Sequence, residues 1–254
     1  MNELSDVRCA YFLIAHGSRD VRSHHGLQAC AALVSQHLER QSPSQSIPMV
    51  GTGVLEFGDR PLGVQIADFA KAAAAIGVGQ VFLIPLFLAA GNHVLEDLPE
   101  AIALAQSHLD ANVALTLCPV LGTHPHLSGL VQTRMGEVSS CDRWILLAHG
   151  TRRPDGNQPI EVLATELGIA PAYWATAPNL EEQILALQEL GAQRIGIAPY
   201  FLFAGRITDA IETHVVELRS KFTALELQLT QPLNPSPLLA KLLIDRCAAV
   251  SVVP

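Results

Sequence analysis

An internal repeat constrains this chain more than any other feature. Residues 11–19 read YFLIAHGSR, and residues 144–152 read WILLAHGTR. A second matched pair follows in the same order, with VFLIPLFLAAG at 81–91 and IGIAPYFLFAG at 195–205. Chance does not readily produce two matched motifs in one order. The chain is therefore predicted to consist of two homologous halves, each folding into a similar domain.

The size and composition of the chain agree with this division. Its 254 residues are enough for two domains, because domains commonly hold about 100–200 residues. Hydrophobic residues make up 49% of the chain and charged residues only 16%, which provides apolar material for two cores. We predict an amino-terminal domain of residues 1–138 and a carboxy-terminal domain, a degenerate copy, of residues 139–254.

Each half alternates apolar runs of strand length with segments of helical character. Such alternation predicts parallel strands joined by helices that cover both faces of a sheet. The predicted fold class is α/β, with two similar doubly wound domains and an active cleft between them. Ligands of such folds bind beyond the carboxyl ends of the strands. The predicted strands are 11–15, 49–55, 81–87, 113–118, 144–148, 172–175, 195–201 and 225–230, and the predicted helices are 23–40, 61–76, 95–109, one that begins after Pro125, 160–168, 180–190, 208–221 and 238–249.

Charge and cysteine usage narrow the class of protein. A net charge of −8 argues against nonspecific nucleic-acid binding, which needs a basic surface. The five cysteines form no CxxC pair and are odd in number, so we expect reduced thiols and a cytoplasmic location. The first residues, MNELSDVR, carry no signal-peptide pattern. The longest apolar run, 81–90, is too short to span a bilayer and contains Pro85, so no membrane partner is expected.

Two histidines stand where such sheets present functional side chains. His16 directly follows the strand at 11–15, and Gly17 allows a tight turn with room for a ligand. His93 follows the strand at 81–87 and a short loop, so we expect it at the same edge of the sheet. Two imidazoles there can hold a metal ion or accept protons near neutral pH. The alternative is a pair of hydrogen-bonded loop histidines.

Glu56 follows the next predicted strand and is expected to reach the same edge. Two histidines and a carboxylate are a suitable set for a divalent metal ion with open coordination positions. The alternative is a solvated glutamate. We therefore predict His16 and His93 as metal ligands, and all three residues as catalytic.

The repeat provides an internal control for these candidates. Aligning PLFLAAGNH with PYFLFAGRI places Ile207 opposite His93, and aligning EFGDRPLGVQI with WATAPNLEEQI places Trp174 opposite Glu56. Only His149, the counterpart of His16, is retained. A set kept in one copy predicts that the amino-terminal domain carries the site and that the other domain forms a wall or lid.

Arginines gather near the same predicted strand ends. Arg19 and Arg152 stand three residues after the paired histidines, with Arg22, Arg153 and Arg206 close to the repeated motifs. Arginines at a strand edge can bind carboxylates in a bidentate manner, although each alone also fits an ordinary surface residue. The predicted substrate-binding set is Gly17, Ser18, Arg19, Arg22, Gly91, Arg152 and Arg206.

Several common catalytic motifs are absent from the sequence. No GxxxxGK[ST] loop is present, so ATP-driven chemistry is not expected, and neither an HExxH helix nor a GxSxG turn appears. The HG[ST]R motif superficially resembles that of histidine phosphatases. Those enzymes need arginine immediately before the histidine, where this chain has Ala15 and Ala148.

Taken together, AHGSRD after the first strand, LE after the second and PLFLAAGNHVLEDLPE around the third resemble the sirohydrochlorin chelatases of the CbiX/SirB type. The resemblance covers nearly the whole chain and places the chain among the class II tetrapyrrole chelatases. It implies insertion of Fe²⁺ or Co²⁺, with Ni²⁺ as a further candidate, into sirohydrochlorin without ATP and without a tightly bound cofactor. It implies metal-site roles for His16 and His93, and an acidic role for Glu56.

The resemblance leaves the metal and one rival function open. Siroheme synthesis needs iron and cobalamin synthesis needs cobalt, and imidazole ligands accept both ions. A non-catalytic carrier of metal or tetrapyrrole would share every residue named above. We expect a monomer, because the repeat already supplies two halves.

Overall fold

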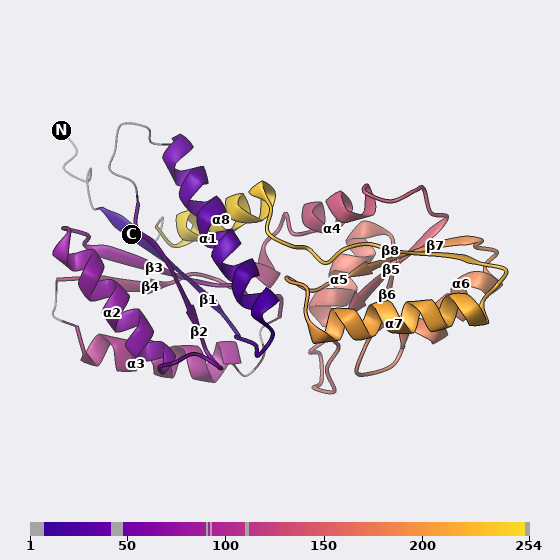
Figure 1. The fold of residues 1–254 in the computed structure, drawn as a ribbon, viewed down its shortest axis with the longest axis horizontal. Helices are drawn as coiled ribbons and strands as arrows, with labels where there is room; N and C mark the ends of the chain where they lie inside the picture. The colour runs from indigo at the N-terminus through magenta and orange to yellow at the C-terminus, as the bar shows by residue number, and fades with distance from the viewer. Residues whose placement is uncertain (1–7, 42–47, 90, 92, 110–111, 252–254) are drawn as a thin grey trace. The chain divides into compact units, whose positions relative to one another are not determined.

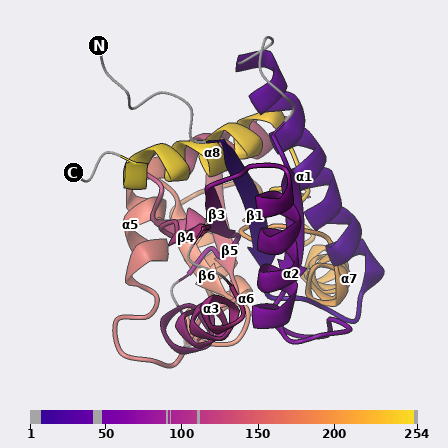
Figure 2. The ribbon, with the colours of Figure 1, turned by 90° about the vertical axis from the view of Figure 1, so that its left-hand side faces the viewer.

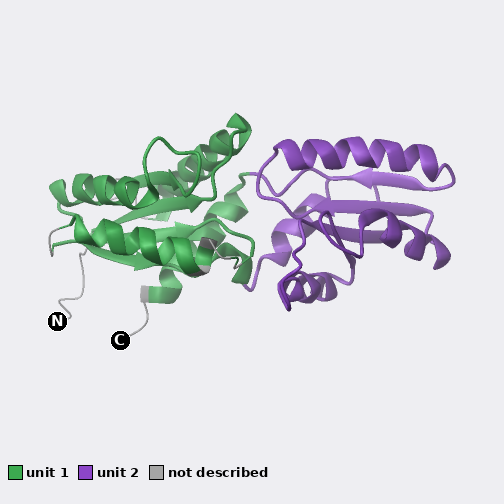
Figure 3. Ribbon diagram, turned by 90° about the horizontal axis from the view of Figure 1, so that it is seen from below, with its two compact units in different colours: residues 1–124, 235–254 green, residues 125–234 purple. Residues whose placement is uncertain are grey.

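The computed structural model describes most of the chain, namely residues 8–41, 48–89, 91, 93–109 and 112–251. The chain divides into two compact units (Figure 3). Unit 1 contains residues 1–124 and 235–254, and unit 2 contains residues 125–234. Each unit has one four-stranded parallel sheet between layers of helices, which confirms the predicted α/β class.

The sheet of unit 1 has the strand order β2-β1-β3-β4, with β1 and β3 at its centre. Its helices α2 and α3 pack together, and so do α1 and α8 (Figure 1). The elements of unit 1 are β1 (Cys9–Ala15), α1 (Val21–Gln41), β2 (Val50–Val54), α2 (Leu62–Ala75), β3 (Gln80–Pro85), the π-helix η1 (His93–Asp97), α3 (Leu98–Ser107), β4 (Ala114–Leu117), the 3₁₀ helix η2 (Leu121–Thr123) and α8 (Pro237–Ser251).

Alternation along β1 explains how this sheet is buried on both faces. Phe12 and Ile14 share a core with Ile66 of α2 and Leu98 of α3. Leu13, between them in sequence, is fully buried although it points to the opposite face. Each such side chain contributes about 1.5–3 kcal/mol when removed from water. The apolar runs therefore form strands that are covered on both sides.

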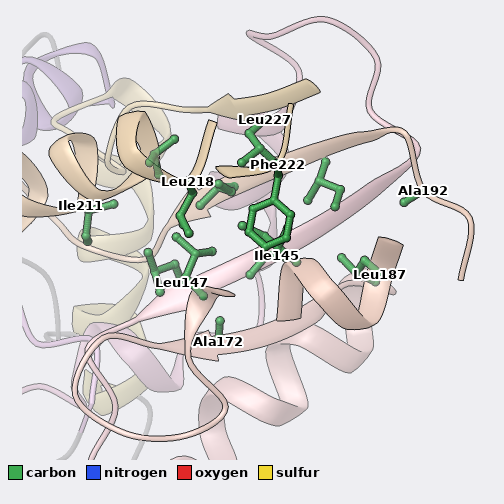
Figure 4. Packing of buried hydrophobic residues seen from close by; sticks show 14 residues of the cluster. Ile145, Leu147, Ala172, Leu187, Ala192, Ile211, Leu218, Phe222 and Leu227 are labelled. Carbon is green, nitrogen blue, oxygen red and sulfur yellow. The ribbon is translucent and has the colours of Figure 1, made fainter. Parts of the chain in front are cut away.

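Unit 2 repeats this arrangement with the strand order β6-β5-β7-β8. Ile145 and Leu147 of the central strand pack against Leu187 of α6 and against Ile211 and Leu218 of α7 (Figure 4). Its elements are α4 (Ser128–Met135), β5 (Arg143–Ala148), α5 (Gln158–Leu167), β6 (Ala170–Tyr173), α6 (Leu180–Glu189), β7 (Arg194–Pro199), α7 (Arg206–Lys221) and β8 (Glu226–Leu229).

The compact units do not coincide with the predicted domains 1–138 and 139–254. Helix α8, the last element of the second half, packs on α1 and β3 in unit 1 (Figure 2). Helix α4, the last element of the first half, packs on α5 and β7 in unit 2. The two repeats have thus exchanged their final helices. The predicted boundary at 138/139 separates the two repeats in sequence, whereas the compact units divide at 124/125 and 234/235, because packing, not chain order, assigns these helices.

All eight predicted strands and eight predicted helices appear in the described part of the chain. One strand is displaced: the sequence predicted 172–175, whereas β6 is Ala170–Tyr173. The helix predicted at 95–109 is preceded by the π-helical turn η1, which the apolar periodicity did not reveal. None of the helices described is long and apolar enough to cross a membrane.

Candidate metal and substrate site

His16 lies at the carboxyl end of β1, a central strand of its sheet. Its neighbour Ala15 pairs with Val54 of β2, and Ile14 pairs with Pro85 of β3. The side chain of His16 is exposed, and its Nδ1 lies 3.2 Å from the carbonyl oxygen of Gly17. Metal-binding histidines commonly donate one ring N–H to such a carbonyl, which directs the other nitrogen toward the metal. The position of His16 therefore suits a metal ligand, because its Nδ1 lies where it can donate to this carbonyl.

Gly17 brings the ends of β1 and β2 unusually close. The backbone N–H of Glu56 donates to the carbonyl of His16 at 2.8 Å. Gly17 has a φ of +94°, and a Cβ placed on it would lie 1.9 Å from the backbone oxygen of Glu56. Only glycine fits there. The turn thus holds the exposed residues His16 and Glu56 side by side at the carboxyl edge of the sheet.

His93 is the first residue of η1. The backbone N–H of the next residue, Val94, donates to the carbonyl of Gly91 at 3.0 Å. The side chain of His93 is outside what the structure describes, so its pairing with His16 stays a prediction. No three His, Cys, Asp or Glu side chains gather to hold a metal ion among the residues that are described.

The predicted arginines of unit 1 have different surroundings. The exposed guanidinium of Arg19 lies 5.2 Å from the ring centre of Phe57, the residue after Glu56. Arg22 forms a fork with Asp20, with Nη2 2.6 Å from Oδ2, and Ser18 Oγ accepts the N–H of Asp20 at 3.0 Å. A substrate carboxylate would have to compete with Asp20 for Arg22.

Unit 2 presents the same backbone arrangement with other side chains. The N–H of Trp174 donates to Ala148 and that of Ala175 donates to His149, both at 2.9 Å. In unit 1, the N–H of Leu55 donates to Ala15 and that of Glu56 to His16. The structural counterpart of Glu56 is therefore Ala175. The predicted counterpart, Trp174, is wrong by one residue, because no sequence motif fixed that alignment.

The remaining predicted residues lie at the corresponding positions of unit 2. Arg152 is exposed in the turn after His149, and Arg206 is exposed at the first position of α7. Ile207, opposite His93 in the repeat, is 39% exposed. Burial raises the pKa of Tyr173, which flanks Gly150, to about 12, so this phenol stays protonated at neutral pH. The residue that pairs with His149 at this edge, Ala175, thus supplies no carboxylate, whereas Glu56 pairs with His16.

A pocket that the sequence did not predict opens near η1. Its volume is about 390 Å³, and its walls come from Pro85 at the end of β3, Val94 of η1, Leu117 and Cys118 at the end of β4, and Thr123 of η2. This pocket lies at the carboxyl edge of the sheet that carries His16. Pro85 and Val94 belong to the motif at 85–100, but no sequence pattern links them to Leu117, Cys118 or Thr123, and only the fold brings these residues together.

Comparisons with known proteins agree with this architecture. A family model described as CbiX matches residues 10–138 and again residues 143–250. The sirohydrochlorin cobaltochelatase of Priestia megaterium is 25% identical over 213 residues, covering 78% of this chain and 68% of that protein. The sirohydrochlorin ferrochelatase of Bacillus subtilis is 24% identical over 225 residues, covering 84% of this chain and 82% of that protein. The structure of SirB from Bacillus subtilis with Fe³⁺ superposes with a TM-score of 0.76, 22% identity and 96% coverage of both chains, and at this identity it shows the fold.

Proposed function

The chain belongs to the CbiX family, and from that premise we propose that it inserts a divalent metal ion into sirohydrochlorin without ATP. The observation that carries the proposal is the turn at Gly17, which joins the backbones of His16 and Glu56, both exposed, at the carboxyl edge of the sheet. The similarity to a cobaltochelatase and to a ferrochelatase supports the reaction class. Because the two identities are nearly equal, they favour neither metal.

The chemistry needs a metal ligand that can release the ion and a group that accepts protons. His16 and His93 are proposed to hold the incoming Fe²⁺ or Co²⁺ through neutral imidazoles and to pass it to the macrocycle. Insertion displaces two pyrrole protons from the ring, and Glu56 or one of the imidazoles is proposed to accept them as a general base. The ring nitrogens are best exposed when the macrocycle is bent, so binding energy used for distortion also lowers the barrier.

The arginines are proposed to bind the carboxylates that sirohydrochlorin carries. Arg19 is exposed and its guanidinium lies near Phe57, the residue after Glu56, so its charge stays close to the proposed metal site. Arg152 and Arg206 are proposed to contribute from unit 2, together with the backbone of Gly91 and the hydroxyl of Ser18 in unit 1. Charge-assisted bidentate contacts suit such groups.

The decisive experiment is anaerobic incubation of the protein with sirohydrochlorin and Fe²⁺, Co²⁺ or Ni²⁺ in turn. Absorbance follows the metallated product, and the reaction without protein gives the spontaneous rate. We expect acceleration with iron or cobalt. Binding of the tetrapyrrole without acceleration by any metal would instead support a carrier, and neither binding nor acceleration would reject both functions.

Two further expectations accompany the proposal. We propose a monomer in the cytoplasm, with the repeat supplying both halves of the site. None of the five cysteines, all of which lie in the described residues, forms a disulfide, which is compatible with a reducing compartment. Light scattering of the purified protein measures the mass, and a dimer would reject the monomer.

A further inference from the structure

Arg246 on α8 is a buried cation without a carboxylate partner among the described residues. Its exposed fraction is 8%, and Nη2 donates to the hydroxyl of Thr123 at 3.0 Å. Its Nε is buried and has no hydrogen-bond partner in the described part of the chain. The adjacent carboxylate, Asp245, instead pairs with Lys241 at 2.6 Å and lies 3.9 Å from His124 Nε2. Burial lowers the pKa of the Arg246 guanidinium.

A buried guanidinium without a carboxylate partner destabilises a folded protein unless another interaction offsets its loss of hydration. Taking a charge out of water is costly, and a buried charge without an opposite partner is the expensive case. The hydroxyl of Thr123 supplies one neutral acceptor, and it also donates to the carbonyl of Val120 at 3.0 Å. The fold therefore holds Arg246 in place but does not neutralise it.

The exchanged helix of unit 2 contains the matching arginine, and there the charge is neutralised. Residues 133–138, TRMGEV, align with residues 245–250, DRCAAV, so Arg134 is the counterpart of Arg246. Arg134 pairs with Glu137 at 2.7 Å, and its Nε and Nη2 donate to the carbonyl of Leu233 at 3.1 and 2.7 Å. The residue aligned with Glu137 is Ala249. The copy in unit 1 thus has the arginine without its built-in carboxylate.

Thr123 connects Arg246 to the pocket beside η1. Thr123 lines that pocket together with the apolar side chains of Pro85, Val94, Leu117 and Val120. The guanidinium therefore lies directly behind one wall of an apolar pocket at the carboxyl edge of the sheet. A ligand that suits this combination has an apolar body and carries a carboxylate.

We propose that Arg246 binds a carboxylate of the tetrapyrrole, with the pocket walls contacting the ring or the methylene groups of the same arm. This subsite rests on the proposed function, which names the tetrapyrrole. The ligand supplies to Arg246 the carboxylate that Glu137 supplies to Arg134. Thr123 is a positioning residue, because its hydroxyl fixes one end of the guanidinium.

The test compares Arg246→Met with Arg134→Met in the full-length protein. Thermal unfolding without ligand, kcat and KM for sirohydrochlorin with Co²⁺, and the Kd of metal-free sirohydrochlorin from an absorbance titration are measured for each. We expect Arg246→Met to raise KM and Kd at least about tenfold, the loss of a charge-assisted pair, with kcat within about twofold. Its unfolding temperature is expected to equal or exceed that of the wild type, because an unpaired buried charge has been removed.

Arg134→Met is expected to show the opposite pattern to Arg246→Met. It should lower the unfolding temperature, because it breaks the pair with Glu137, and leave KM unchanged. A lowered unfolding temperature with unchanged KM and Kd for Arg246→Met would overturn the subsite and make Arg246 a purely structural residue. Should Arg246→Met fail to fold, Arg246→Lys keeps the charge and the buried stem. A threefold or larger rise in KM is then expected, because an ammonium cannot bind a carboxylate in the same forked way, and an unchanged KM rejects the subsite.

The outcomes also separate this inference from the proposed function. A wild-type protein that accelerates insertion while Arg246→Met keeps its KM and Kd rejects the subsite alone. A wild-type protein that binds sirohydrochlorin without accelerating insertion, with weaker binding by Arg246→Met, rejects the enzyme but supports the subsite. A wild-type protein that does not bind sirohydrochlorin rejects both.

Discussion

The carboxyl ends of β1 and β5 have the same backbone but different chemistry. In each, the residue after the strand is a histidine whose carbonyl accepts an N–H from the neighbouring strand end, Glu56 in unit 1 and Ala175 in unit 2. Each histidine precedes a glycine with positive φ. The residue hydrogen-bonded to His16 carries a carboxylate, and the residue hydrogen-bonded to His149 carries only a methyl group. Both units therefore share the turn as part of the fold. The side chains that follow each strand differ, and on that difference we propose that the edge at β1, not the edge at β5, carries the reaction.

The largest expected effect comes from the two glycines. In Gly150→Ala the new Cβ would meet Tyr173 Cβ and Thr176 Oγ1 at 2.6 and 2.7 Å, and of these atoms only the threonine hydroxyl can rotate away. In Gly17→Ala it would meet the backbone oxygen of Glu56 at 1.9 Å, which cannot move without displacing the turn. We expect Gly150→Ala to destabilise the protein by about 1–3 kcal/mol from positive-φ strain, and Gly17→Ala by more, with loss of turnover. Denaturant unfolding of both variants measures this, and equal losses would contradict the difference between the turns.

The histidines come next. We expect His16→Ala and His93→Ala each to lower turnover at least about tenfold, equivalent to about 1.4 kcal/mol of barrier, because each removes a proposed metal ligand. His149→Ala is the matched control and should stay within about threefold of the wild type. Steady-state rates of Co²⁺ insertion by the three variants and the wild type test this expectation. A larger loss for His149→Ala than for both others would move the site to unit 2.

These histidines also show what the sequence could predict. Apolar runs followed by His-Gly placed His16 and His149 correctly at strand ends, because a buried parallel strand leaves few alternatives for such a run. The alignment of Glu56 with Trp174 was wrong by one residue, since the segment after that strand carries no motif. Only the hydrogen bonds to His16 and His149 reveal that Ala175 is the counterpart.

The exchanged helices and the pocket near η1 could not be predicted from the sequence, because both depend on tertiary packing. The exchange of α4 and α8 depends on which apolar surfaces meet, and chain order does not contain that information. The lining of the pocket near η1 comes from segments distant in sequence, such as Pro85 and Thr123. The missing carboxylate partner of Arg246 could be predicted in part from the sequence, because aligning the two final helices places Ala249 opposite Glu137.

A smaller effect is expected at the carboxylate that distinguishes the two turns. Glu56→Gln keeps the shape and removes the charge, and we expect turnover at pH 7 to fall about threefold to tenfold, because the imidazoles remain able to accept protons. Ala175→Glu, which places a carboxylate beside His149, should leave turnover unchanged. Rates of both variants against sirohydrochlorin and Co²⁺ test this. A gain of activity in Ala175→Glu would mean that unit 2 needs only a carboxylate to react.

The smallest effect concerns the opposite, amino-terminal ends of the same strands. Just before β5, the carboxylate of Asp142 accepts the N–H groups of Gln193 and Arg194 at 3.0 and 2.8 Å, and Arg194 Nη2 at 3.1 Å. In unit 1, the HGSR and HGTR alignment places Cys9 at this position, so the first sheet lacks the carboxylate there.

Those hydrogen bonds from the backbone of Arg194 and Gln193 hold the pKa of Asp142 below its ordinary value of 3.8. The ionised carboxylate therefore contributes stability above pH 3.8, and that contribution is lost as the pH falls through the lower folded-state pKa. Because Asp142 is exposed, we expect Asp142→Asn to lower the unfolding temperature by at most about 2 °C at pH 7. Thermal unfolding between pH 7 and pH 3 should show the difference from wild type narrowing below pH 4. Cys9→Ser should differ from wild type by the same amount throughout this range, and a parallel pH dependence in both variants would show that the narrowing does not come from Asp142.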